Sequence, residues 1–111
     1  MDLSDSTDHA FFKALADPTR LRIVHLLLRG DFCVGDITRI LALPQSTVSR
    51  QLAILKAGGV VADARNGKHV HYGLQDGAPL DNLRPWLAEL SLREPYQSDL
   101  ITLSMVRRSG R

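Results

Sequence analysis

The segment Gln45–Gln51 carries the side chains whose types and spacing point most directly to chemistry. It reads Gln-Ser-Thr-Val-Ser-Arg-Gln, and the apolar residues Val48, Leu52 and Leu55 recur at helical spacing. The polar side chains therefore share the opposite side of a helix. Arginine and glutamine can form paired hydrogen bonds with base edges, while serine and threonine hydroxyls bond phosphates or bases. A polar helix face is more often only solvated, so this pattern alone does not establish a nucleic-acid site.

A second group of candidate residues surrounds the dipeptide Asn66-Gly67. Asn-Gly is a strong signal for a two-residue type I′ loop, so the sequence predicts a hairpin over 60–74 with Arg65 opposite Lys68. In that register Asp63 faces Val70 and Val61 faces Tyr72. Arg65, Lys68 and His69 would then lie at the hairpin tip, from which basic side chains can reach phosphates or a minor groove.

Two histidines of this hairpin are weak candidate metal ligands. His69 and His71 lie on one strand face beside the small residues Ala62 and Ala64. With a further ligand they could hold one nickel or zinc ion, but histidines at a hairpin tip more often face solvent or DNA. Cys33 is the only cysteine, so the chain has neither an internal disulfide nor a Cys-x-x-Cys motif. We interpret it as a small residue at a helix start rather than a reactive thiol.

These residues must be positioned by a set of short elements. Asp17-Pro18 is a strong helix start, Leu43-Pro44 breaks the chain, and Cys33 with Asp36 takes the two positions of a capping box. The apolar periodicity predicts helices over 6–15, 18–29, 34–42, 45–57, 80–92 and 98–106. The pair at 34–42 and 45–57 has the size of a helix-turn-helix, whose second helix fits the major groove of DNA.

Length and composition allow this interpretation without establishing it. The chain has 111 residues, which suits one domain, and its formal charge of +2 with a pI of about 9.0 permits a nucleic-acid partner. We find no Gly-rich phosphate loop, nucleophile–base pair or paired carboxylates, which argues against an enzyme. The first residues hold aspartates and no basic residue, and no apolar run could cross a membrane, so we expect a cytoplasmic protein.

Three stretches of the sequence follow one another in a familiar order. They are 12–23 with Ala-Asp-Pro-Thr-Arg, 45–52 with Ser-Thr-Val-Ser-Arg followed by Leu55–Gly58, and 66–72. Together they resemble the ArsR/SmtB family of metal- and stress-sensing repressors over about residues 10–75, and the fifth helix continues the pattern to about 92. One departure is Gln51, where the family often has histidine.

The resemblance implies a mainly α fold with a small β-hairpin, the homodimeric winged helix-turn-helix of order α-α-α-α-β-β-α. We expect one domain with a core over about 8–92 and an extension over 93–111. The implied function is that of a sequence-specific transcriptional regulator, most consistent with a repressor that binds operator DNA as a dimer and leaves it when a signal binds. The alternative is a winged-helix module that binds protein and no longer reads DNA. A protein-binding version would be expected to turn the reading face apolar, so the retained polar and basic residues favour DNA.

Two metal sites of the family look absent from this sequence. Family sensors often carry Cys-Val-Cys-Asp around the third helix, where this chain reads Cys33-Val34-Gly35-Asp36, and one thiol cannot hold arsenite. Others bind zinc on the fifth helix through Asp, His and Glu, where this chain has Asp81 and Glu89 but no histidine. We therefore expect no certain cofactor and at most weak binding of nickel or zinc.

The resemblance also assigns candidate residues to two surfaces. Leu80, Leu83, Leu87 and Leu90 alternate spacings of three and four, which predicts a dimer seam, joined by Phe11 or Phe12. The candidate DNA-binding residues are Gln45, Ser46, Thr47, Ser49, Arg50, Gln51, Lys56, Arg65, Lys68 and His69.

Overall fold

The computed structural model describes residues 6–109 as a bundle of helices with a small antiparallel sheet. The elements are α1 (Ser6–Leu15), α2 (Pro18–Leu27), β1 (Phe32–Cys33), α3 (Val34–Leu41), α4 (Gln45–Ala57), β2 (Val61–Asn66), β3 (His69–Leu74), α5 (Leu80–Glu89), the 3₁₀ turn η1 (Leu90–Leu92) and α6 (Tyr96–Ser109). Expectations about the first five residues and the end of the basic tail lie outside the described residues. None of the described helices is long and apolar enough to span a membrane.

The helix starts follow the predicted signals with one exception. The carboxylate of Asp17 accepts hydrogen bonds from the backbone N–H groups of Thr19 and Arg20, both at 3.0 Å, and so caps α2. The capping box predicted for α3 is wrong, because no side chain caps that helix and Asp36 pairs with Arg39 at 2.8 Å. A thiol is a weak hydrogen-bond acceptor, so Cys33 cannot replace the serine of a capping box.

The hairpin of β2 and β3, called the wing from here on, forms with a different register from the predicted one. Asn66 pairs with His69 and Asp63 with Tyr72, so the two-residue loop is Gly67-Lys68 rather than Asn66-Gly67. Gly67 has a φ of +65° and is the loop residue with positive φ, which is the pattern of a type II′ turn.

The change of register moves the predicted partners by two positions. Side chains alternate between the two faces of a strand, so an even shift keeps each of them on its predicted face. Ala62, Ala64, His69 and His71 therefore still share one face, as predicted. Strand β1 was not predicted, since two residues are too short for a periodic signal. It pairs with β3 through Phe32 opposite Tyr72 and Cys33 opposite His71, giving the strand order β1-β3-β2.

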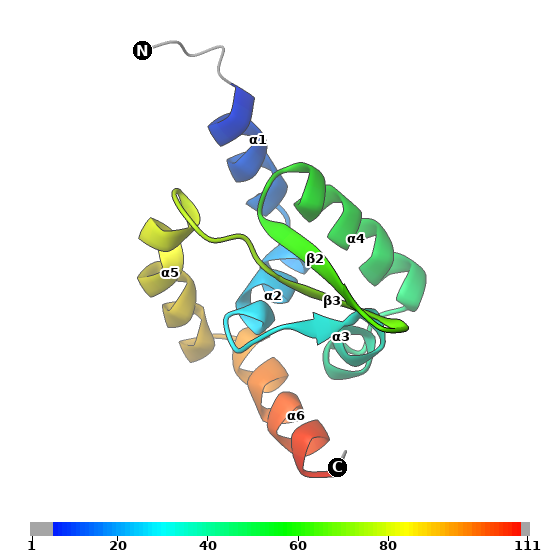
Figure 1. The fold of residues 1–111 in the computed structure, drawn as a ribbon. Coiled ribbons are helices and arrows are strands. Elements are labelled where there is room, and N and C mark those ends of the chain that lie inside the picture. The colour runs from blue at the N-terminus through cyan, green and yellow to red at the C-terminus, as the bar shows by residue number, and fades with distance from the viewer. Residues whose placement is uncertain (1–5, 110–111) are drawn as a thin grey trace.

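The core lies between α2, α3, α4 and the sheet, and it confirms the predicted apolar stripes. Its fully buried side chains include Ile23, Val24 and Leu26 of α2, Ile37 of α3, and Val48, Leu52 and Leu55 of α4. Figure 1 shows the outcome of this packing: α4 and the end of the wing lie on one side of the molecule and α5 on the other. The helix proposed to read DNA and the helix proposed to form the dimer thus occupy different surfaces.

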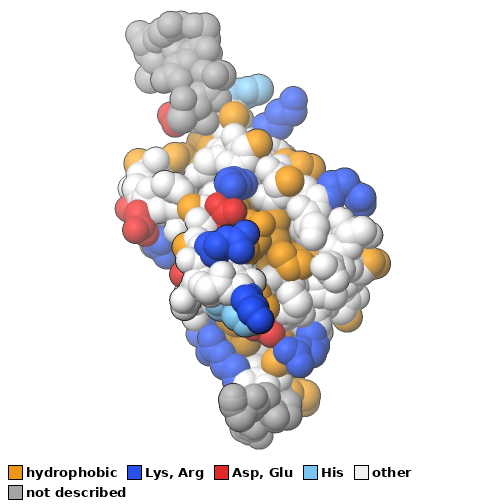
Figure 2. All heavy atoms as spheres, turned by 45° about the vertical axis from the view of Figure 1, so that its right-hand side comes forward, with side chains coloured by type: hydrophobic (Ala, Val, Ile, Leu, Met, Phe, Trp, Pro, Cys, Tyr) orange, Lys and Arg blue, Asp and Glu red, His pale blue; other side chains and the backbone are white. Residues whose placement is uncertain are grey.

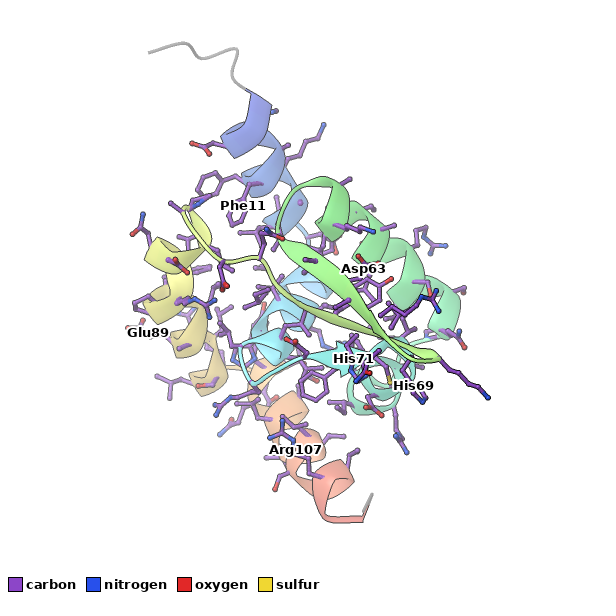
Figure 3. All side chains as sticks on the ribbon, viewed as in Figure 1. Phe11, Asp63, His69, His71, Glu89 and Arg107 are labelled. Atoms are coloured by element: carbon purple, nitrogen blue, oxygen red, sulfur yellow. The ribbon has the colours of Figure 1, made fainter. Side chains whose placement is uncertain are left out.

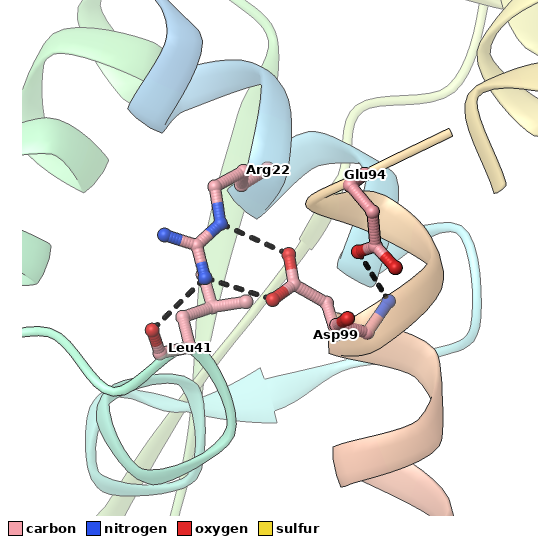
Figure 4. A network of polar contacts seen from close by, with 5 residues as sticks. Arg22, Leu41, Glu94 and Asp99 are labelled. Carbon is pink, nitrogen blue, oxygen red and sulfur yellow. Dashed lines mark hydrogen bonds and ion pairs between the residues drawn. The ribbon is translucent and has the colours of Figure 1, made fainter.

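Helix α6 is longer than predicted and is tied to the helix-turn-helix by a buried ion pair. Asp99 is 4% exposed, and its two carboxylate oxygens accept hydrogen bonds from Nε and Nη2 of Arg22 at 3.0 and 2.8 Å. The same Nη2 donates to the carbonyl of Leu41, the last residue of α3, at 3.0 Å. Glu94 accepts from the backbone N–H of Ser98 and so caps the start of α6 (Figure 4). Arg22 therefore connects α2, α3 and α6 at one point.

Candidate nucleic-acid interface

Helix α4 presents a polar side to solvent because the apolar residues of its opposite side are buried in the core. Val48, Leu52 and Leu55 are 0% exposed. Successive residues of an α-helix are about 100° apart, so Ser46 and Arg50 lie at the middle of the opposite side, and both are exposed. A helix that buries one side against its own domain and offers short polar groups with one arginine on the other can enter a major groove.

The flank of α4 nearer α2 is occupied by an internal contact. Oε1 of Gln51 accepts a hydrogen bond from Nη1 of Arg20 at 2.8 Å, and Nε of Arg20 also donates to the carbonyl of Ala14. Thr47 lies on the same flank and is half-buried. Gln51 therefore holds α4 against α2 and the end of α1 in this structure, and its assignment as a reader of bases stays a prediction.

The other flank of α4 is joined to the wing. Nζ of Lys56 lies 3.0 Å from Oδ1 of Asp63 on β2, and Figure 3 shows Asp63 beside α4. This hydrogen bond and the positive charge of Lys56 lower the pKa of the Asp63 carboxyl below its usual range. Gln45 and Ser49 lie on this flank and are exposed. Lys56 therefore forms an exposed ion pair between α4 and β2, and its assignment as a DNA contact stays a prediction.

The wing tip carries the basic side chains that the sequence placed there. Arg65, Lys68 and His69 are all exposed, and Figure 2 shows Lys and Arg side chains spread over the face that holds α4 and the wing. Positive charge at a wing tip beside an exposed polar helix matches the negative backbone of DNA on either side of a groove.

The two wing histidines lie close together, and Cys33 is on the neighbouring strand. The rings of His69 and His71 are 6.4 Å apart near the end of the wing (Figure 3). Cys33 lies opposite His71 on β1. Among residues 6–109, no group of three or more His, Cys, Asp or Glu side chains is arranged to hold a metal ion.

Most side chains of the predicted dimer seam are buried within the protomer itself. Leu80, Leu87 and Leu90 are 1%, 0% and 5% exposed, Phe11 is also buried, and Leu83 is half-buried. The heptad-like spacing of the leucines therefore serves the protomer's own core, and their assignment to an interface stays a prediction.

The apolar side chains that do face solvent on this side are Phe12 and Trp86, which are 48% and 50% exposed. They line an open hollow of about 380 Å³ together with Leu83 and residues of α1 and α2. The sequence reasoning missed Trp86. The available signal was a lone tryptophan among the polar positions of α5.

Comparison with known proteins places the same region in one family. The sequence model described as "Bacterial regulatory protein, arsR family" matches residues 17–63, which run from the cap of α2 into the wing. The arsenic resistance transcriptional regulator ArsR1 of Pseudomonas putida is 38% identical over 93 residues, covering 74% of this chain and 73% of that protein. A transcriptional repressor SmtB homolog of Synechocystis is 44% identical over 66 residues, and the match spans 50% of its length.

Solved structures with the same arrangement extend the likeness to the fold. The transcriptional repressor PagR of Bacillus anthracis superposes with a TM-score of 0.67 at 31% identity, over 77% of this chain and 97% of that one. A homodimeric winged helix-turn-helix DNA-binding domain from Mycobacterium bovis gives a TM-score of 0.65 at 26% identity, over 83% of this chain and 87% of that one. The predicted winged helix-turn-helix fold is confirmed.

Proposed function

Because the chain belongs to the arsR family of bacterial regulatory proteins, we propose that it binds operator DNA as a homodimer and represses transcription. The observation that carries this proposal is the exposed polar side of α4, centred on Ser46 and Arg50, with the basic wing beside it. The family and the relatives are transcriptional regulators rather than enzymes. A protein that reads chromosomal operators acts in the cytoplasm, and we propose that location from the function.

The alternative of a protein-binding module is not favoured. A winged helix that had exchanged DNA for a protein partner would be expected to show an apolar reading face. Here Gln45, Ser46, Ser49 and Arg50 are all exposed along α4. Ile54 is the one large apolar side chain of α4 that is exposed, at 39%, whereas the more exposed Phe12 and Trp86 belong to α1 and α5. The apolar surface thus favours self-association and the polar surface favours nucleic acid.

We place the dimer contact at the hollow formed by Phe12, Leu83 and Trp86. An isologous contact brings the same patch of two protomers together, and aromatic side chains are enriched at the centres of interfaces. The hollow lies on α1 and α5, away from the exposed side of α4 (Figure 1). Dimer formation through this patch therefore leaves both reading helices free, and it sets the distance between them.

We expect the purified protein to retain DNA fragments that share an inverted repeat, with half-sites about 34 Å or a multiple of that distance apart, because a two-fold dimer reads two-fold sites. Sequencing of the retained fragments measures this, and light scattering should give twice the chain mass. Trp86→Lys should give the mass of one chain and lose the selection, since a lysine cannot be buried unpaired at the contact.

The matched control for that experiment is Leu92→Lys. Leu92 is 78% exposed and does not line the hollow, so this variant should remain a dimer and select the same sites. A wild-type protein that has the mass of one chain, or fragments that share no sequence, would contradict the proposal.

Metal regulation is plausible, because several relatives are named for arsenic or cadmium resistance. We propose that His69 and His71 hold nickel or zinc only weakly, since two imidazoles leave the ion without enough protein ligands. Isothermal titration with zinc, nickel and arsenite should then show weak binding or none. Nanomolar affinity lost in His69→Ala/His71→Ala would contradict this proposal. Nanomolar affinity that survives both that variant and Cys33→Ser would show a different site.

A further inference from the structure

A second hollow lies between α2 and α5 and takes no part in the surfaces described above. Its volume is about 340 Å³, and it is lined by His25, Leu28 and Arg29 from α2 and by Arg84 and Ala88 from α5. Pockets for small molecules in proteins start at about 300 Å³ and combine apolar walls with a few polar groups. This hollow has both features at the lower end of that size range.

His25 is the buried polar group of this hollow, and it is not satisfied by the protein. The residue is 1% exposed, and its Nδ1 has no hydrogen-bond partner among the described residues. The ring of Tyr96 packs edge-on against the imidazole at 5.2 Å. Because this nitrogen is buried and has no hydrogen-bond partner in the described part of the chain, the His25 signals report on changes in the wall of the hollow.

The imidazole of His25 itself carries no charge in this hollow. Burial and the positive charge of Arg29 lower the pKa of His25, against a smaller opposite effect of Asp99. Its imidazole is therefore neutral at neutral pH and offers one N–H donor and one acceptor.

The two arginines of the hollow differ in how far their charge is already balanced. Arg84 forms ion pairs with two carboxylates: its Nη2 lies 3.7 Å from Oδ1 of Asp76, and its Nε lies 3.2 Å from Oδ1 of Asp81. The guanidinium of Arg29 takes part in none of the described ion pairs. Arg29 therefore supplies an uncompensated positive charge at the rim of the hollow.

From this geometry we infer that the hollow between α2 and α5 binds a small organic carboxylate. The carboxylate pairs with Arg29, whose planar guanidinium can bond both oxygens. An apolar remainder of the ligand contacts Leu28 and Ala88, which are the uncharged walls. The buried imidazole of His25 lies in the wall of the hollow and adds no charge there. The volume of the hollow admits a ligand with one or two aromatic rings.

The position of this site gives it a route to DNA reading. Helix α2 packs against α4 in the core, and α5 carries Trp86 of the proposed dimer contact. A ligand that bridges α2 and α5 therefore touches both the element under the reading helix and the element that sets the spacing of the dimer. This regulatory role rests on the proposed function, whereas binding itself does not, because the binding experiment contains no DNA.

The test is a titration of the full ¹⁵N-labelled chain followed through the imidazole nitrogens of His25. Sodium acetate, benzoate and 2-naphthoate are the probes, benzamide is the neutral counterpart of benzoate, and sodium phosphate is the inorganic anion. Benzoate should shift the His25 signals in a saturable way at constant ionic strength, and benzamide and phosphate should not. An equal response to benzamide or phosphate, or no saturable shift with any of the three carboxylates, overturns the inference.

The decisive variant is Arg29→Gln, which changes an exposed side chain and should keep the circular dichroism spectrum of the wild type. It should weaken benzoate binding at least 10-fold, and Arg84→Gln should weaken it less because that arginine is already paired. Arg93→Gln, an exposed arginine outside the hollow, is the matched control and should bind like the wild type. Equal binding by Arg29→Gln and Arg93→Gln overturns the site. Binding of benzoate by a protein that fails to select DNA would refute the proposed function alone.

Discussion

Asp99→Ala should lower the free energy of unfolding by about 3 kcal/mol, the low end of what removal of one partner from a buried ion pair costs. The side chain of Asp99 is 5% exposed and that of Arg22 is 21% exposed, so the variant leaves a mostly buried guanidinium without its counter-ion. In the wild type this carboxylate raises the pKa of Arg22. The variant loses that effect, but a guanidinium stays protonated in proteins, so Arg22 cannot relieve the loss by releasing its proton.

The loss should be large because the ion pair joins three helices. The guanidinium of Arg22 donates hydrogen bonds to Asp99 of α6 through Nε and Nη2. Its Nη2 also donates to the carbonyl of Leu41 at the end of α3 (Figure 4). Without Asp99, α6 keeps its apolar contacts around Leu103 and the contacts of Arg107 with the carbonyl of Arg29 and the ring of Phe32, but it loses its buried tie to α2 and α3. Thermal unfolding followed by circular dichroism should show a fall in Tm of about 10 °C for a domain of this size.

Asp36→Ala is the matched control for this prediction. It removes an exposed carboxylate that pairs with Arg39 at the same distance of 2.8 Å, but on the surface of one helix. Exposed pairs of this kind contribute less than about 1 kcal/mol. Equal stability losses for the two variants would contradict the role given to Asp99.

The sequence was sufficient for those parts of the fold that local signals determine. Asp17 and Pro18 set the start of α2, Pro44 sets the start of α4, and the spacing of Val48, Leu52 and Leu55 decides which side of α4 faces solvent. Each of these signals acts within one or two helical turns. The order of the elements followed from such signals, and the resemblance of three stretches to the ArsR/SmtB family implied the fold class.

The parts that could not be predicted depend on contacts between distant residues or on close alternatives. Arg22 and Asp99 are 77 residues apart, and the local sequence around neither residue predicts that they form an ion pair. Asn66-Gly67 and Gly67-Lys68 are both acceptable two-residue loops, and the structure uses the second. The leucines of α5 fit an interface as well as a core by spacing alone, and only the packed chain shows that Leu87 is buried inside the protomer.

Arg50→Ala should reduce operator binding by at least about 30-fold while reducing binding to scrambled DNA much less. A paired contact between an arginine and a base edge contributes about 1–3 kcal/mol. A dimer loses it in both half-sites, which gives about 2–6 kcal/mol in total. Arg50 lies at the middle of the exposed side of α4, so we expect it to face bases rather than phosphates.

Lys68→Ala should behave differently, because the wing tip reaches backbone phosphates. It should weaken binding to operator and scrambled duplexes to a similar extent. It should also lower the slope of log affinity against log salt by about 0.9 for each phosphate that the variant no longer binds, or about 2 for the dimer. Arg93→Ala removes an exposed arginine away from α4 and the wing, so it serves as the control and should change neither affinity nor slope.

The most direct test of DNA reading by α4 is a gel-shift titration of wild-type protein, Arg50→Ala and Lys68→Ala on both duplexes. Salt concentrations of about 50 and 200 mM separate the electrostatic contribution from base recognition. We expect Arg50→Ala to reduce the operator-to-scrambled affinity ratio at both salt concentrations. Lys68→Ala should keep that ratio and flatten the salt dependence. If both variants bind the two duplexes with the affinity of the wild type, DNA reading by α4 and the wing is contradicted. The protein-binding alternative would then be the better explanation.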